Sequence, residues 1–148
     1  MAKDSFTIDL TAFQEKIKDN VVEAVREVAA EAFRQIVGFS PTPQNSDAGY
    51  SRGSYVLSHR IAINKVDSST TVVPGARGDK DYGAASKAMG QLSNLDGLKL
   101  GDTAFISNSL PYAHKVEYLG WHSRSPYNTF EKAVVATNHR LPSIIAGL

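Results

Sequence analysis

The chain has 148 residues, of which 42% are hydrophobic and 21% are charged, and its net charge at neutral pH is +1. This composition is typical of a soluble globular protein, and the small net charge argues against a nucleic-acid binder that depends on strong electrostatic attraction. The absence of cysteine excludes disulfides and thiolate metal sites.

The length predicts a single domain spanning residues 1–148. The N-terminal residues lack the apolar segment of a signal peptide, and no run of about 18 apolar residues predicts a membrane span. Acidic side chains are in excess over residues 1–50 and basic ones over residues 51–148. A head-to-tail contact between subunits can use this asymmetry, although solvated faces explain it equally well.

Residues 11–37 are predicted to form one long amphipathic helix. Apolar residues recur there at intervals of three and four, which places them in a single stripe. The stripe consists of Phe13, Ile17, Val21, Val25, Val28, Ala32 and Ile36. Core packing is the simplest interpretation, and a helix of this length can also line a subunit interface.

A β-hairpin is predicted next, from strands at residues 54–64 and 70–73. In the first strand, alternation places one set of side chains on a buried face: Tyr55, Leu57, His59, Ile61 and Ile63.

Residues 76–101 then form a glycine-rich insertion, in which residues 84–92 are predicted to be a short helix. Such an insertion is either functional or partly disordered before assembly.

Residues 101–125 are the most informative stretch. A short strand is expected at residues 103–106, after which Pro111 is well placed to open a short helix. Helical spacing puts Tyr112, Val116 and Leu119 near one face and Glu117 elsewhere. An aromatic-rich corner follows, with the only tryptophan of the chain, Trp121.

A last helix is predicted at residues 126–140, where Pro142 stops or kinks it. The predicted fold class is therefore α+β. We expect a small antiparallel sheet of three to five strands, packed by the long N-terminal helix and the C-terminal helix.

The sequence carries no strong catalytic pattern. No histidines have the spacing of a helical zinc site, and no phosphate-binding glycine loop is present. His114 and Glu117 are spaced to ligate a metal on one helix face, but an exposed surface pair is the favoured interpretation. We expect no enzymatic activity, cofactor or metal.

The corner resembles a signature of the neck and tail-completion proteins of long-tailed bacteriophages, the family that includes the minor tail components of lambdoid phages. The matching residues in this stretch are Ile106, Ser107, Asn108, Leu110, Pro111, Tyr112, Ala113, Glu117 and Tyr118. Ser40-Pro41, Asp47-Ala48-Gly49 and Arg52-Gly53-Ser54-Tyr55 are similar to a second family element, in which Arg52 can tie the loop to carbonyls or carboxylates.

The resemblance implies a structural virion protein that forms rings at the head–tail junction, completes the tail and joins it to the head. Its implied partners are other copies of the chain, as a hexamer or a dodecamer, together with neighbouring neck and tail proteins. The implied location is the virion, and the host cytoplasm during assembly. The residues expected to define the fold or the interface are Arg52, Leu110, Pro111, Tyr112, Glu117, Tyr118 and Trp121.

Two alternatives remain at this point. The first is a tail terminator that stops polymerisation of the tail tube. The second is a small phage-encoded hydrolase that depends on a metal, or a DNA-binding accessory protein.

Overall fold

The computed structural model describes residues 11–45, 51–75, 78–120 and 125–148, except for the side chains of residues 11–13. The elements follow one another in the order α1 (Thr11–Phe39), α2 (Ser54–Leu57), β1 (His59–Ile63), α3 (Ala84–Ala88), η2 (Met89–Leu95), β2 (Ala104–Asn108), η3 (Lys115–Leu119) and α4 (Thr129–Ala146). None of the described helices combines the length and the apolarity that a membrane span requires.

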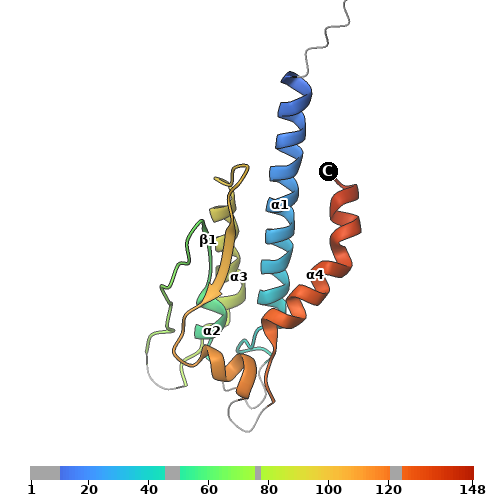
Figure 1. Cartoon of the computed structure of the whole chain (residues 1–148). Coiled ribbons are helices and arrows are strands. Elements are labelled where there is room, and N and C mark those ends of the chain that lie inside the picture. Colours follow the sequence, from blue (N-terminus) through green and yellow to red (C-terminus); the bar gives the residue numbers. More distant parts are fainter. Residues whose placement is uncertain (1–10, 46–50, 76–77, 121–124) are drawn as a thin grey trace, which may run out of the picture.

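Helix α1 is the axis of the molecule. The sheet and α3 lie on one side of it, α4 packs along another side, and its first turns project beyond all of them (Figure 1). At about 1.5 Å per residue, its 29 residues span roughly 44 Å. The long helix predicted from the apolar period is therefore confirmed, but only its second half is enclosed by the rest of the chain.

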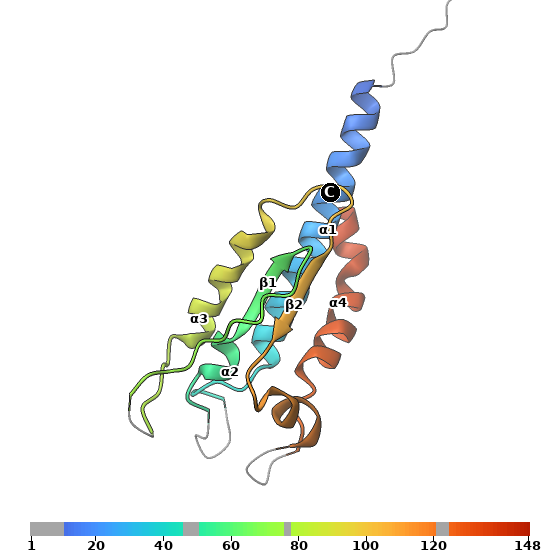
Figure 2. The same cartoon turned by 60° about the vertical axis from the view of Figure 1, so that its left-hand side comes forward.

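The sheet consists of β1 and β2, which pair antiparallel with His59 opposite Asn108 and Ile63 opposite Ala104 (Figure 2). A small antiparallel sheet with a long N-terminal helix and a C-terminal helix confirms the predicted α+β class. The expectation of three to five strands is wrong for the described part of the chain, which contains two.

The predicted hairpin is also wrong, because residues 70–73 form no strand. Side-chain hydroxyls bind this segment instead. The Ser58 Oγ accepts a hydrogen bond from the Thr71 N–H at 3.0 Å and donates one to the Thr71 carbonyl at 2.9 Å. The Ser54 Oγ accepts one from the Val73 N–H at 2.8 Å. The segment thus runs past β1 without a ladder of main-chain bonds.

Residues 54–57 form a short helix where a strand was predicted. Tyr55 and Val56 are both buried although they are neighbours in sequence. Adjacent residues of a strand point to opposite faces, whereas a helical turn lets both face the interior. The strand then begins at His59.

The main core lies between α1 and the layer formed by the sheet, α3 and η2. Its most deeply buried members include Phe33, Val56, Ile61 and Leu95. The glycine-rich insertion contributes to it through α3 and η2, so this region is a structural part of the domain. The predicted short helix is present as α3 and the start of η2, and Ala88 and Leu95 are among the most deeply buried residues of these two elements.

Helix α4 begins at Thr129 and runs through Pro142 to Ala146, so the proline does not end it. The helix bends along its length (Figure 1). A proline inside a helix removes one main-chain hydrogen bond, which favours such a bend.

Candidate interaction surface

The corner after β2 is built on a small apolar cluster of its own. Leu110 and Val116 pack against Tyr55 of α2, and Tyr112 lies at the margin of the same cluster. Two of the residues singled out in the sequence, Leu110 and Tyr112, therefore help to hold the corner against the body. Pro111 is exposed beside them.

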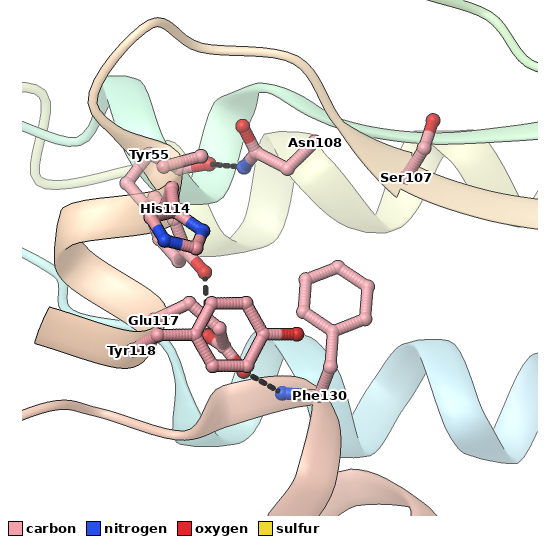
Figure 3. Close-up of a pocket in the computed structure, with 8 residues that line it drawn as sticks. Tyr55, Ser107, Asn108, His114, Glu117, Tyr118 and Phe130 are labelled. Atoms are coloured by element: carbon pink, nitrogen blue, oxygen red, sulfur yellow. Dashed lines mark hydrogen bonds between the residues drawn. The ribbon is translucent and has the colours of Figure 1, made fainter.

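Glu117 lies at the centre of this corner, with only 3% of its surface exposed. The Tyr55 hydroxyl donates a hydrogen bond to Oε2 at 3.0 Å, and the Phe130 N–H donates one to Oε1 at 2.6 Å (Figure 3). Phe130 is in the first turn of α4, where N–H groups lack partners within the helix and a negative charge is stabilised. One carboxylate thereby ties η3 to both α2 and α4.

Burial and the neighbouring carboxylate of Glu117 both raise the pKa of Tyr55 well above its usual value. Burial disfavours the phenolate, and a second negative charge beside it disfavours it further. Tyr55 therefore remains a neutral donor to Glu117 across the physiological pH range.

The register of η3 differs from the one expected for an α-helix. Its residues form a π-helical turn, in which main-chain bonds reach five residues along the chain. The wider turn brings Val116 and Glu117 inward and leaves Leu119, which was expected inside, 66% exposed. Tyr118 is also exposed, at 57%, and its ring lies 5.1 Å from that of His114.

A cavity of about 290 Å³ opens between this corner, the end of β2 and the start of α4. His114 and Tyr118 lie on its outer side, while Glu117 is engaged by Tyr55 and Phe130 (Figure 3). The interpretation of His114 and Glu117 as an exposed surface pair is therefore right for His114 and wrong for Glu117, whose carboxylate is buried by its two hydrogen-bond donors. Among the described residues, no cluster of three or more acidic or histidine side chains is arranged to hold a metal.

Arg52 ties the loop, as its sequence context suggested, and it lies close enough to the corner to interact electrostatically with Tyr112. Its Nε donates a hydrogen bond to the Asp79 carbonyl at 2.6 Å, and one Nη donates to the Pro74 carbonyl at 3.4 Å. Trp121 and residues 47–49 lie outside the described part of the chain.

His59 is a central residue whose burial the alternation predicted but whose contacts it did not. The Ser40 hydroxyl donates to the Ile36 carbonyl at the end of α1, so the His59 Nε2–H donates to Ser40 Oγ, at 2.7 Å. Asn108 Nδ2 donates to the other ring nitrogen at 3.2 Å. Burial and the adjacent Arg60 lower the pKa of His59 to about 3, which keeps the ring neutral.

Ser40 and His59 therefore do not form a nucleophile and its base. Both side chains are fully buried, and the hydroxyl proton is directed at a helix carbonyl. The contact joins the end of α1 to the start of β1. No local motif could have predicted it, because the two residues meet only through the packing of α1 on the sheet.

Exposed apolar side chains gather away from the corner, on α1 and α4. On α1, the first half of the predicted stripe is open to solvent at Ile17 (46%), Val21 (43%) and Val25 (40%). On α4, Val134 and Ile145 are exposed as well. At the C-terminus, Leu148 is exposed as well.

Comparison of the chain with models of protein families, with curated proteins and with solved structures gives no significant match. The function is therefore argued from the residues and from the geometry above.

Proposed function

We propose that this protein is a structural subunit of a tailed-phage particle, which forms a ring at the head–tail junction, completes the tail and joins it to the head. The observation that carries the proposal is the exposed apolar stripe formed by Ile17, Val21 and Val25 on the first half of α1. In an isolated copy these side chains face water. Their burial against other copies is a source of favourable free energy for assembly.

The resemblance of the corner residues to neck and tail-completion proteins supports the same proposal. Its buried members, Leu110 and Glu117, fix the shape of the corner, while Pro111 and Tyr118 are available for contact. Each copy then presents one patch to the neighbour before it and another to the neighbour after it. Repetition of such a heterologous contact closes a ring when the rotation between copies allows it.

Glu117 and His59 are two side chains that could act as a catalytic acid or base. Both are held in structural contacts, which favours a role in assembly over catalysis. The Glu117 carboxylate is engaged by Tyr55 and by the start of α4, and His59 is held neutral beneath the surface. A general base must reach its substrate directly or through one water. Both groups instead perform structural tasks.

The test is the mass of the protein in solution, measured by light scattering at several concentrations, followed by electron microscopy of any assembly. We expect a hexameric or dodecameric ring, alone or on phage tails that lack this protein. A chain that stays monomeric and does not bind such tails would overturn the proposal.

A further inference from the structure

The outer edge of β2 has main-chain groups without partners. The Asn64 N–H donates to the Thr103 carbonyl at 2.8 Å, which sets the alternation of the ladder. Phe105 therefore bonds to β1, while Ala104 and Ile106 direct their N–H and C=O groups away from it. No residue in the described part of the chain bonds to the main-chain groups of Ala104 or Ile106.

The opposite edge of the sheet is already occupied. The Ile61 N–H donates to Gln91 Oε1 at 3.1 Å, and Asn94 Nδ2 donates to the Ile61 carbonyl at 3.0 Å. Two side chains from η2 thus take the place of a neighbouring strand beside β1. This capping blocks a further strand beside Ile61, whereas no described residue blocks one beside Ala104 and Ile106 of β2.

Apolar side chains flank the free edge on its α1 side. The sheet packs on the face of α1 that carries Phe33, and Glu31 reaches α4 through an ion pair with Arg140 at 2.8 Å. By helical spacing, Val21 and Val25 lie on the face between these two contacts. Figure 1 shows α1 between the sheet and α4.

Helix α4 adds apolar side chains beside the same edge of β2. Phe130 lines a cavity together with Ser107 and Asn108 of β2. Val134, one turn further along α4, lies on the same face as Phe130 and is exposed. A strand added beside β2 therefore has main-chain partners on one edge and apolar side chains beneath it.

We propose that this place is filled by residues 5–10 of a second copy of the chain, as an added strand. In that segment Phe6, Ile8 and Leu10 alternate with Thr7 and Asp9, so one face is apolar and the other polar. Strand addition of this kind draws affinity from main-chain bonds and specificity from alternate side chains. The inference rests on the proposed function, because it names the contact that links one subunit to the next.

The donor is a second copy because residues 5–10 of the same copy would fall short of β2. His59 lies against Phe33, with ring centroids 6.4 Å apart, and pairs with Asn108. At about 3.3 Å per strand residue and 1.5 Å per helix residue, Ala104 at the other end of β2 is level with roughly residue 24 of α1.

If residues 5–10, here called the arm, turned back along α1 from its start, the chain would advance only about 16 Å from Thr11 to Phe6. Phe6 would then be level with roughly residue 22 of α1. Its apolar residues would stop before β2 begins. The arm of a neighbouring copy has no such limit.

The first test introduces single cysteines. The wild-type chain contains no cysteine, so no other disulfide can form. One batch carries Thr7→Cys and a second carries Phe105→Cys, at an exposed position on the face of β2 opposite to that of Ala104 and Ile106. On mixing and oxidation we expect a disulfide between the two batches, and a ladder of linked copies from the double variant. Thr7→Cys mixed with Tyr82→Cys, an exposed position on another face, is the control and should give none.

The second test compares two full-length variants by light scattering. Ile8→Asp places a charge on the apolar face of the arm and should at least halve the mean mass. Thr7→Asp adds the same charge to the polar face and should leave it unchanged. Ala104→Pro, at the first residue of β2, removes an outward N–H that β1 does not use and should act like Ile8→Asp.

The outcomes separate the two proposals. A disulfide that forms only within single copies of the double variant overturns the exchange between copies. Rings that persist in Ile8→Asp, with no disulfide in the mixture, overturn the arm but leave the ring. A wild-type chain that neither self-associates nor binds tails overturns the proposed function itself.

Discussion

Glu117 shows most directly how a single residue organises the corner. Its carboxylate is buried and accepts hydrogen bonds from Tyr55 and from the start of α4. A buried charge held by two donors is stabilising as long as both bonds remain, and each donor loses its partner when the carboxylate is removed.

Glu117→Ala is therefore expected to lower the free energy of unfolding by about 2–3 kcal/mol, because hydrogen bonds to charged groups contribute about that much. Urea denaturation measures the loss. Tyr118→Ala, at the adjacent exposed position, is the matched control and should cost less than about 0.5 kcal/mol. If Tyr118→Ala cost as much as Glu117→Ala, Tyr118 would have to be a core residue in solution.

His59 makes the stability of the folded protein depend on pH. Its folded pKa of about 3 lies below the value near 6.5 of an unfolded histidine. Between these values the unfolded chain binds one more proton than the folded chain, so stability is complete above about pH 6.5 and falls as the pH is lowered.

The expected slope from His59 is about 1.4 kcal/mol per pH unit through the acid range below pH 6. Urea denaturation at pH 7 and pH 5 measures it, and the same pair of measurements on His59→Gln gives the contribution of all other groups. A wild-type slope no steeper than that of His59→Gln would show that the ring is protonated in the folded protein.

At the scale of elements, periodicity predicted α1, β2 and α4 because each is long enough, or clearly enough bounded, for one pattern to dominate. The period of two misled at residues 54–58, where tertiary packing turns the backbone into α2 so that Tyr55 and Val56 can both be buried. It misled again at residues 70–73, because Ser54 and Ser58 supply the bonds that a strand would have supplied.

The corner shows a different limit. Helical spacing assigned Leu119 to the interior, but the π-helical turn of η3 brings Glu117 there instead. A carboxylate is a poor candidate for burial until its partners are known, and Tyr55 and Phe130 come from distant parts of the chain. Glu117 was among the residues singled out in the sequence, whereas its contacts could not be predicted.

The outer edge of β1 is capped at Ile61 by side chains of η2, whereas the outer edge of β2 is free within the described part of the chain. The capping can be tested. Gln91→Ala removes the acceptor of the Ile61 N–H, which is buried with the rest of that residue. The expected loss is about 1–2 kcal/mol in urea denaturation, the usual cost of an unsatisfied buried donor. Gln91→Glu keeps the acceptor oxygen and should recover part of the loss, whereas equal losses in both variants would contradict the edge-capping role.

At the scale of the whole molecule, α1 has two different halves. Its second half is enclosed by the sheet layer and α4, while its first half carries the same apolar stripe into solvent. Sequence periodicity cannot detect this change, because it identifies the apolar face of a helix and not the elements that cover that face. The open stripe, the free edge of β2 and the exposed Val134 therefore became one candidate surface only when the elements were placed in space.

Self-association should consequently depend on the first half of α1 more than stability does. In the double variant Val21→Gln, Val25→Gln, glutamine is a better helix former than valine and both positions are exposed, so the free energy of unfolding of a single copy should change by less than about 1 kcal/mol. Each valine is already partly buried, so its full burial in an assembly contributes about 1 kcal/mol, and losing both should weaken each contact by roughly tenfold or more. Sedimentation or light scattering over a dilution series measures this shift.

Val135→Gln is the matched control for this prediction. Val135 is exposed on the far side of α4, beside Phe39 and His139, so its replacement changes an apolar surface that the proposed contact does not use. We expect its association to equal that of the wild type. If Val135→Gln weakened assembly and the α1 variant did not, the ring contact would have to be moved to the outer face of α4, and the first half of α1 would need another partner.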